Sequence, residues 1–315
     1  MRTSRSLLYR SPAPTVVALG CFDGVHLGHR AVICRAVEIA KGKELTSLVW
    51  TFEEPAKNFF VPGSVPLITT WEEKKTQIRR LGIDVLVCGA LEPAITSLSP
   101  KDFFEKILIE RLNAKHLVCG FNYSFGQGGR GDTALLGELC RKHGIGLTVI
   151  PAVSMEGLEV SSTQIRAAVE DGRPADAAVL LGRPYALRTI VIDGQKLARR
   201  LGFPTLNQVF RRGALVPKRG VYVTRIRMAG KEKHGITNVG IRPTVGGSLL
   251  CAETHIFDFE GDLYGKTVTV EFLHFLRAET KFDSVELLSE QVRTDIEQAQ
   301  LWLKSRSKKH PLALS

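Results

Sequence analysis

The chain has 315 residues, more than one hydrophobic core usually serves, so we expect two domains. Its 44% hydrophobic and 24% charged residues exclude a disordered or fibrous protein and are typical of a globular one. The 43 Lys and Arg residues outnumber the 32 Asp and Glu residues, and the formal charge of +11 favours anionic partners such as nucleic acid, membrane surfaces or polyphosphates, although it also fits a surface that is merely well solvated.

The first half of the chain alternates short β-branched runs with longer amphipathic segments. This pattern predicts an α/β domain with a parallel, Rossmann-like sheet covered by crossover helices. The expected strands are residues 16–19, 47–52, 84–88, 116–119 and 147–150. The first helix is expected over residues 27–41, with Gly42 as its stop and one apolar face formed by Ile33, Ala36, Val37 and Ala40.

After residue 181, strand-like runs follow one another directly. The expected strands are residues 187–192, 221–228, 234–239, 252–259 and 266–275. Such a succession predicts a mainly antiparallel sheet or small barrel. The chain then ends in a helix over about residues 284–304, whose apolar residues at helical spacing are Val285, Leu288, Val292, Ile296 and Ala299. We place the boundary near Gly182 and predict domains of residues 1–181 and 182–315.

The cysteines and the N-terminus bear on the cellular compartment. No two cysteines form a Cys-x-x-Cys pair, so we expect neither a zinc site nor redox chemistry but buried, reduced thiols at Cys21, Cys34, Cys88, Cys119, Cys140 and Cys251. The N-terminus lacks a continuous apolar segment, and no run approaches about 18 apolar residues. We therefore expect a cytoplasmic enzyme without a membrane partner.

The segment of residues 20–29 follows the first strand and opens the first helix. Unpaired amide groups and the helix dipole favour a phosphate at such a place. Gly24 and Gly28 let the backbone approach a ligand closely. His26 and His29, three residues apart, can face the same way and donate hydrogen bonds to an α-phosphate as charge builds on its oxygens. A single histidine here would more often be a structural residue, but two favour a site.

Two further polar clusters belong to the same half. The first, which includes Asn122, Phe125 and Asp132, comes straight after the strand at 116–119, at the edge where parallel sheets bind ligands. The second is the run of residues 161–166. Its hydroxyls can simply cap the next helix, yet Arg166, one turn on, can reach a phosphate.

The H-x-G-H pattern resembles the signature of nucleotidylyltransferases, and the three clusters together resemble the adenylyltransferase module of bacterial bifunctional riboflavin kinase/FAD synthetases. The resemblance implies that His26 and His29 stabilise the transferring phosphate while FMN's own phosphate attacks in line and Mg²⁺ bridges phosphate oxygens. It implies that ATP phosphates are bound by Gly20, Phe22, Asp23, Gly24, Gly28, Ser162, Thr163 and Arg166. It implies that flavin is bound by Asn122, Phe125 and Asp132.

Two positions depart from that family's pattern. Cys21 stands where relatives often have Asn, and residues 51–55 lack the histidine that commonly precedes Pro55. If that histidine serves ATP binding, we expect slower transfer here.

In the second half, a basic turn precedes Pro204-Thr205-Leu206-Asn207. Thr205 and Asn207, two apart on an extended chain, point the same way and offer neutral oxygens to one cation. The alternatives are that Pro204 and Asn207 only mark a turn and that the basic side chains are solvated. Further on, Glu253 and His255 share one strand face, so either can act as a base.

These segments, with residues 238–244, 262–266 and 275–277, resemble a riboflavin-kinase barrel in order and spacing. The resemblance implies that Glu253 takes the proton from the ribityl 5′-hydroxyl as it attacks the γ-phosphate, and that Thr205 and Asn207 hold Mg²⁺. It implies a flavin-side or phosphate contact for Arg277, which otherwise is a surface arginine. It assigns ATP binding to Gly194, Lys196, Arg199, Gly202 and Pro204. Ala198 replaces a usual glycine, at a cost of about 1 kcal/mol if a positive φ is needed.

We therefore expect a bifunctional enzyme that uses ATP to phosphorylate riboflavin to FMN and to adenylylate FMN to FAD, releasing pyrophosphate. One alternative is an FMN adenylyltransferase with a weakened kinase module. Another is a flavin-sensing regulator that binds nucleic acid, suggested by the charge and by the basic tail of residues 304–309. Because the sequence contains neither a recognition helix nor an aromatic RNA-binding motif, we expect no nucleic-acid partner.

Overall fold

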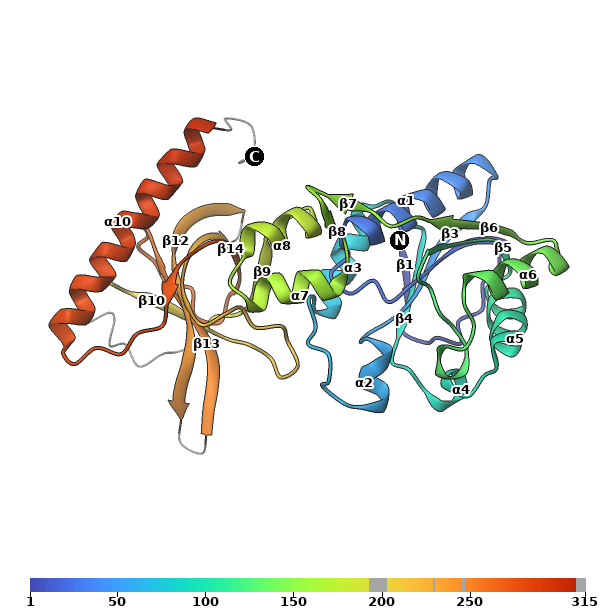
Figure 1. Ribbon diagram of the computed structural model, residues 1–315, viewed down its shortest axis with the longest axis horizontal. Helices are drawn as coiled ribbons and strands as arrows, with labels where there is room; N and C mark the ends of the chain where they lie inside the picture. The colour runs from blue at the N-terminus through green and yellow to red at the C-terminus, as the bar shows by residue number, and fades with distance from the viewer. Residues whose placement is uncertain (193–202, 229, 245–246, 310–315) are drawn as a thin grey trace. The chain divides into compact units, whose positions relative to one another are not determined.

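The computed structural model describes residues 1–192, 203–228, 230–244 and 247–309 (Figure 1). Contacts divide the chain into two compact units. The first contains Met1–Gln164 and Leu180–Gly182, and the second contains Ile165–Val179 and the chain from Arg183 onward. Within the described ranges, no helix has the length and apolar character needed to cross a membrane.

The first unit is built on a six-stranded sheet in the order β1-β4-β3-β2-β5-β6, in which every neighbouring pair is parallel. Its strands are β1 (Arg2–Ser4), β2 (Thr15–Leu19), β3 (Thr46–Phe52), β4 (Val85–Gly89), β5 (Ala114–Gly120) and β6 (Gly146–Ile150). A small hairpin follows, formed by β7 (Ser154–Met155) and β8 (Leu158–Glu159). The parallel α/β sheet predicted from the sequence is confirmed, and only β1 lacks a counterpart among the expected strands.

Helices cover both faces of this sheet (Figure 1). They are α1 (Leu27–Gly42), α2 (Ala56–Phe60), α3 (Trp71–Arg80), α4 (Pro93–Thr96), α5 (Pro100–Asp102), a π-helix η1 (Phe103–Arg111), a 3₁₀ turn η2 (Gln127–Gly129) and α6 (Thr133–His143). Two more, α7 (Ser162–Glu170) and α8 (Pro174–Leu181), are divided between the units.

Alternate residues of the strands point into two apolar cores. Val16 and Ala18 of β2 pack in the core under α1 and α3, whereas Val17 and Leu19 pack in the core under η1 and α6. The predicted apolar face of α1 is confirmed, because all four of its expected residues are buried. The central strands are therefore covered on both sides, as a parallel sheet requires.

All six cysteines are free thiols, as predicted. Four are buried, but Cys21 and Cys34 are partly exposed. Burial raises the pKa of the Cys88 and Cys140 thiols to about 11, which keeps them protonated at neutral pH.

The second unit is built on a six-stranded antiparallel sheet in the order β10-β13-β12-β11-β14-β9. Its strands are β9 (Tyr185–Ile190), β10 (Thr205–Val209), β11 (Gly220–Met228), β12 (Lys231–Thr244), β13 (Gly247–Ile256) and β14 (Thr267–Ala278). The sheet curls until its edges meet, where the Ile192 amide donates to the Asn207 carbonyl at 2.9 Å. The predicted antiparallel, barrel-like domain is confirmed.

The C-terminal helix α10 (Val285–Lys309) packs against the outer face of this sheet. Val292 and Ile296 meet an apolar cluster that includes Val221 and Val223, and Ala299 is fully buried there. The prediction that Val285 belongs to the packed face is wrong, because this residue near the first turn is 46% exposed. The helix also continues past residue 304, so much of the expected polar tail is helical.

Three buried threonines cross the interior of the curled sheet. The Thr237 hydroxyl lies 2.8 Å from that of Thr224 and 2.9 Å from that of Thr254, and none of the three residues is exposed. The ladder joins β11, β12 and β13. Since a buried hydroxyl costs free energy unless it is hydrogen-bonded, the three satisfy one another.

We expect Thr237→Val to lower the free energy of unfolding by about 1–3 kcal/mol, although valine has the same shape. The change removes the partner of the buried Thr254 hydroxyl and leaves the Thr224 hydroxyl only its longer contact to the Gly235 carbonyl, at 3.3 Å. Chemical denaturation followed by circular dichroism measures this loss. Thr267→Val, at an exposed position of β14, is the matched control and should change little. A Thr237→Val protein as stable as the wild type would contradict the ladder's role.

Candidate functional site

The first candidate site is the loop between β2 and α1, at the carboxyl edge of the parallel sheet. Its backbone is unusual, because Phe22, Gly24 and Val25 have φ angles of +52°, +84° and +43°. A left-handed backbone costs a residue with a side chain roughly 1–2 kcal/mol. The surrounding structure must therefore hold this loop in place.

Hydrogen bonds to Asp23 help to fix this loop. Its carboxylate is buried and accepts hydrogen bonds from the amides of Ile68 at 3.1 Å and Thr69 at 3.2 Å. The Gly24 amide donates to Thr69 Oγ1 at 3.1 Å, and Ser162 Oγ donates to the Asp23 carbonyl at 3.2 Å. The carboxylate of Asp23 is thus turned toward main-chain donors, and a phosphate would be met by the loop's backbone and not by this anionic side chain.

The two histidines predicted to act together lie together. His26 is the N-cap of α1, and its Nδ1 accepts a hydrogen bond from the His29 amide at 3.2 Å. The two rings stack with centroids 3.5 Å apart and planes inclined by 17°. Because Nδ1 accepts, the neutral ring of His26 carries its proton on Nε2, so Nε2 is the donor nitrogen of this ring. Both rings therefore stand where a helix N-terminus favours an anion.

Two glycines near these rings leave room for them. A Cβ at Gly28 would lie 3.3 Å from the His26 ring, and one at Gly20 would lie 2.9 Å from the ring of Phe22. Phe22 is itself buried and meets His29 edge-on, with centroids 5.2 Å apart. These residues shape the histidine pair, and direct ligand contact by the Phe22 ring stays a prediction.

The residues of the run 161–166 make different contacts. Ser161 Oγ accepts from the Gln164 amide at 3.3 Å, so for Ser161 the helix-capping alternative holds. Ser162 reaches the Asp23 carbonyl, as described above, and Thr163 is exposed beside it on α7. Arg166 lies further along α7, in the second unit. Phosphate contacts of these residues stay predictions.

The predicted flavin residues of this unit differ in what they offer. Asn122 is exposed just after β5, open to a ligand. Phe125 is 5% exposed and packs in the core with Phe103, so a ligand contact would require its ring to leave that core. Asp132 caps α6, where its carboxylate accepts from the Leu135 amide at 2.9 Å. Phe125 and Asp132 thus have structural contacts of their own, and a flavin contact by either stays a prediction.

The second candidate site is a row of side chains across the curled sheet. Arg277, Val221, Asn238, Glu253 and Asn207 are opposed in turn on the strands β14, β11, β12, β13 and β10. Since directly opposed residues of antiparallel strands project to the same face, Glu253 shares a face with Asn207 and Asn238. Burial raises the pKa of the Glu253 carboxyl, and nearby Arg242 acts against that rise. A partly buried carboxyl with a raised pKa suits a general base.

One contact of His255 bears on whether Glu253 or His255 is the base. His255 Nδ1 lies 3.0 Å from the Pro204 carbonyl, and its ring meets that of Phe203 at 5.9 Å. The tautomer that donates to this carbonyl holds the chain just before Thr205, which opposes His255. This geometry favours a structural role for His255, and Glu253 stays the predicted base.

A cavity of about 370 Å³ opens beside this row. It is lined by Thr205 and Asn207, by Leu206 and Thr254 from the barrel interior, and by the loop of residues 259–264. Within the described part of the chain, no group of three or more His, Cys, Asp or Glu residues could hold a metal ion. Thr205 and Asn207 offer only neutral oxygens, so they suit a cation that also binds phosphate.

Several predicted ATP-binding residues cannot be placed. Gly194, Lys196, Arg199 and Gly202 lie outside the described residues, as does Ala198. Pro204 is described and is exposed beside the cavity.

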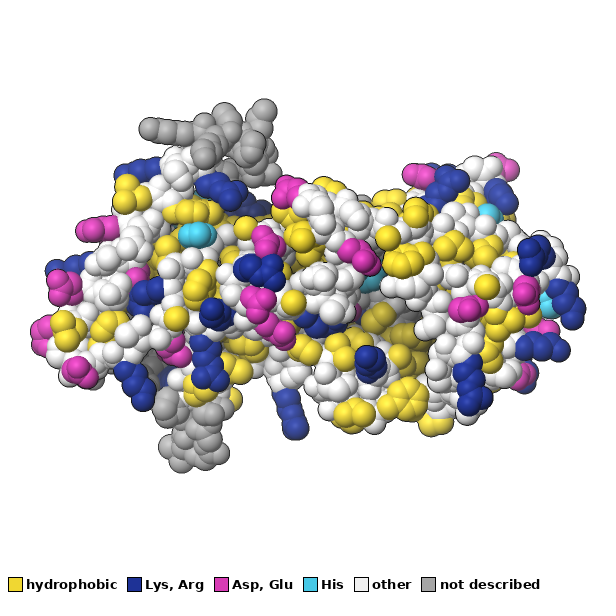
Figure 2. Space-filling view, in the orientation of Figure 1, with side chains coloured by type: hydrophobic (Ala, Val, Ile, Leu, Met, Phe, Trp, Pro, Cys, Tyr) yellow, Lys and Arg dark blue, Asp and Glu magenta, His cyan; other side chains and the backbone are white. Residues whose placement is uncertain are grey.

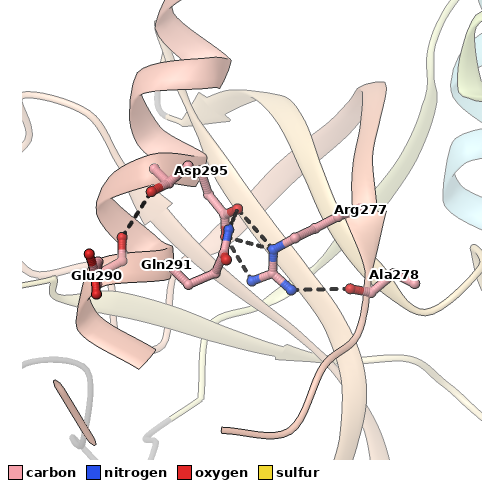
Figure 3. A network of polar contacts seen from close by, with 6 residues as sticks. Arg277, Ala278, Glu290, Gln291 and Asp295 are labelled. Carbon is pink, nitrogen blue, oxygen red and sulfur yellow. Dashed lines mark hydrogen bonds and ion pairs between the residues drawn. The ribbon is translucent and has the colours of Figure 1, made fainter. Parts of the chain in front are cut away.

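Arg277 is already engaged in a buried contact. Figure 3 shows its guanidinium directed at Asp295 of α10, with Nε and Nη2 each 2.8 Å from a carboxylate oxygen. Gln291 donates to the same carboxylate at 3.0 Å, and the Asp295 side chain is 2% exposed. Arg277 is therefore not the simple surface arginine that we kept as an alternative, and its expected flavin contact stays a prediction.

Asn238 lies in the segment of residues 238–244 that resembles the riboflavin-kinase barrel, but it is not among the predicted site residues. Its position opposite Glu253 depends on the register of β12 against β13, which no local pattern reveals. The one signal in the sequence that could have indicated Asn238 is its polar side chain within the strand-like run from Ile236 to Val239.

Comparison with known proteins gives concordant results for both units. A family model described as FAD synthetase matches residues 9–164, and one described as riboflavin kinase matches residues 181–303. A bifunctional riboflavin kinase/FMN adenylyltransferase of Bacillus subtilis (strain 168) is 36% identical, covering 93% of this chain and 94% of the relative. The protein of the same name from Escherichia coli (strain K12) is 33% identical, covering 94% and 96%.

A solved structure has the same fold over nearly the whole chain. It is titled macrolide-efflux protein from Streptococcus pneumoniae, and it matches with a TM-score of 0.84 and 32% identity over 93% of this chain and 96% of its own. That title disagrees with the names of the relatives. The sites above contain the groups expected for phosphate chemistry, so we follow the relatives.

We expect Arg277→Met to lower the free energy of unfolding by about 3–5 kcal/mol, because it leaves Asp295 charged and buried without its partner. The double variant Arg277→Met/Asp295→Leu should recover most of that loss. Arg173→Met, which removes two exposed ion pairs, with Asp171 and with Asp176, is the control and should cost at most about 1 kcal/mol. If chemical denaturation found the double variant as unstable as the single one, the ion pair would not explain the loss.

Proposed function

This chain belongs to the family of bifunctional riboflavin kinase/FMN adenylyltransferases, and we propose that its second unit makes FMN from riboflavin while its first unit makes FAD from FMN. The enzyme is a transferase that uses ATP in both reactions. Both an FAD synthetase model and a riboflavin kinase model match this chain. The alternative of an FMN adenylyltransferase with a weakened kinase module is therefore not favoured. We keep residues 1–181 and 182–315 as the proposed catalytic modules.

The stacked pair His26 and His29 carries the proposal for the first unit. Adenylyl transfer needs no protein nucleophile, because the phosphate of FMN attacks the α-phosphorus of ATP and pyrophosphate leaves. Charge then builds on the α-phosphate oxygens. The Nε2–H of His26, the ring of His29 and the first amides of α1 are the donors that would stabilise it.

The row Asn207–Glu253–Asn238 carries the proposal for the second unit. As the ribityl 5′-oxygen bonds to the γ-phosphorus, its proton passes to the Glu253 carboxylate and ADP leaves with the bridging oxygen. Thr205 and Asn207 would hold the divalent cation, which we propose is Mg²⁺. When bound, such a cation neutralises charge on the phosphate oxygens. The cavity beside Thr205 has room for part of one substrate.

The basic composition does not require a nucleic-acid partner. Figure 2 shows Lys and Arg side chains dispersed over this face of both units, with acidic side chains among them, and not gathered into one stripe. We therefore keep small molecules as the proposed partners, namely ATP, riboflavin and FMN. A cytoplasmic location stays a prediction.

Incubation of the purified protein with riboflavin and Mg-ATP, followed by separation of the flavins, tests both assignments. We expect His29→Ala to slow FAD formation about 10²- to 10³-fold while FMN accumulates, because a donor to the transferring phosphate is lost. We expect Glu253→Gln to slow FMN formation about 10²- to 10⁴-fold, while FMN supplied directly still becomes FAD.

His143→Ala serves as a control histidine, since this residue lies on α6 in contact with Leu139. It should leave both rates near those of the wild type. The proposal fails for the first unit if His29→Ala makes FAD at the wild-type rate, and for the second if Glu253→Gln makes FMN at that rate.

The pH profile of FMN formation reports the ionisation of Glu253. Because burial raises the pKa of its carboxyl and the base acts when deprotonated, kcat/KM should rise with pH through a midpoint above the ordinary value of 4.5. Arg242→Met removes a charge that lowers this pKa, so the midpoint should move to still higher pH. Arg227→Met, on an exposed part of β11, should leave it in place. A midpoint that falls in Arg242→Met would contradict this assignment.

A further inference from the structure

A lysine is buried beneath the first site. Lys74 lies on α3 and is 1% exposed. Its Nζ donates to the carbonyl of Phe52 at 2.7 Å and to that of Cys21 at 3.1 Å, and it lies 3.5 Å from the carbonyl of Glu53. A buried ammonium costs several kcal/mol unless such partners satisfy it. Lys74 is buried on the same helix as the core residue Ile78, where an apolar side chain is usual, so this lysine calls for a functional explanation.

The acceptors of Lys74 lie at the ligand-binding edge of the sheet. Phe52 is the last residue of β3, and Cys21 is the second residue after β2. Open parallel sheets bind ligands at this carboxyl edge. The Cys21 carbonyl also accepts from the buried Thr51 hydroxyl at 2.7 Å. The loop between β2 and α1, which leads to His26 and His29, is called the histidine loop below. The Cys21 carbonyl, at its start, thus accepts hydrogen bonds from two donors, Thr51 of β3 and Lys74 of α3.

The contact stands directly before the strained part of the loop. Cys21 precedes Phe22, the first of the residues with positive φ. Residues 68–74 hold the loop at two points, since the amides of Ile68 and Thr69 bind Asp23 and the ammonium of Lys74 binds Cys21. The start of α3 is itself fixed by a capping box between Thr70 and Glu73. Movement at Lys74 would therefore be passed to the turn that leads into His26.

The ammonium also supplies charge that a neutral residue would not. Its three described acceptors are neutral carbonyl oxygens, so none of them cancels its positive charge. Because the group is buried, solvent and salt screen it little. It therefore contributes a favourable potential to an edge of the sheet that receives a triphosphate in the proposed reaction.

We propose that Lys74 is a positioning residue for adenylyl transfer, which fixes the loop carrying His26 and His29 and adds positive potential beneath the ATP phosphates. This inference rests on the proposed function of the first unit. Lys74 does not touch the reacting atoms, and it acts through the Cys21 carbonyl and through its charge.

The test compares Lys74→Met with Lys75→Met, its neighbour on α3, whose side chain is 28% exposed. With FMN and Mg-ATP, Lys74→Met should make FAD about 10- to 100-fold more slowly, with a raised KM for ATP, because the histidines lose their alignment. FMN formation from riboflavin by the same variant is an internal reference for the second unit and should keep its wild-type rate. Lys75→Met should match the wild type in both reactions.

Lys74→Arg and Thr51→Val separate positioning from folding. Lys74→Arg keeps the charge and should recover part of the FAD rate that Lys74→Met loses. Thr51→Val removes only the second donor to the Cys21 carbonyl. It should slow FAD formation about threefold to tenfold, which is more than its unfolded fraction at the assay temperature accounts for. If Lys74→Met does not fold, the rate of FAD formation by Thr51→Val decides whether the contacts to the Cys21 carbonyl position the loop.

The inference is overturned if folded Lys74→Met makes FAD at the wild-type rate with an unchanged KM for ATP, or if its rate falls only in proportion to its unfolded fraction. It is likewise overturned if Lys74→Met does not fold and Thr51→Val matches the wild type. A wild-type protein that makes no FAD at all would instead refute the proposed function, so the two failures are distinguishable.

Discussion

The register of the strands decides where chemistry can occur in this protein. In the second unit, Glu253 opposes Asn207 on one side and Asn238 on the other. A shift of one residue in either ladder would turn Glu253 toward the barrel interior, where Thr254 now lies. In the first unit, the parallel register ends β2, β3 and β5 at one edge, and the histidine loop starts there. Both candidate sites thus depend on backbone hydrogen bonds far more extensive than the sites themselves.

Buried charged groups then orient the segments that this register brings together. Asp23 and Lys74 fix the histidine loop from the segment that begins α3, and Arg277 with Asp295 ties α10 to β14. A buried charge is stable only with its partners in good geometry, so each of these groups selects one arrangement of its loop or helix. The strained backbone at Phe22 and Val25 persists because it is held in this way.

In the proposed reactions, the two units use different groups for two phosphoryl chemistries. The first presents imidazoles and helix amides, which suit charge developing on an α-phosphate, and it needs no base because the attacking phosphate is already ionised. The second presents a carboxylate with a raised pKa, because an alcohol must lose its proton to attack the γ-phosphate. If the proposed roles are right, the difference in nucleophile accounts for two histidines at one site and a glutamate at the other.

The order of elements could be predicted from the sequence because it rests on local patterns. The alternation of β-branched runs with amphipathic helices indicated the parallel sheet, and the apolar face of α1 followed from its 3.6-residue period. The histidine pair could also be predicted, since residues three apart at a helix start face one way. By contrast, the sequence could not show that Phe125 also packs in the core, that Asp132 also caps a helix or that Asp23 accepts from main-chain amides. A polar or aromatic residue in a loop looks the same whether it contacts a ligand, a core or a helix end.

The amino-acid sequence by itself thus determined the class of both units, the histidine pair and the carboxylate that we propose as a base. Tertiary structure alone decided that Asn238 stands beside Glu253, that His255 holds Pro204, and that Lys74 lies under Cys21. The physical reason is the distance along the chain over which each interaction acts. Periodicity and capping act within a few residues of the chain, whereas the partner of Lys74 is 53 residues away and is chosen by how helices pack on a completed sheet.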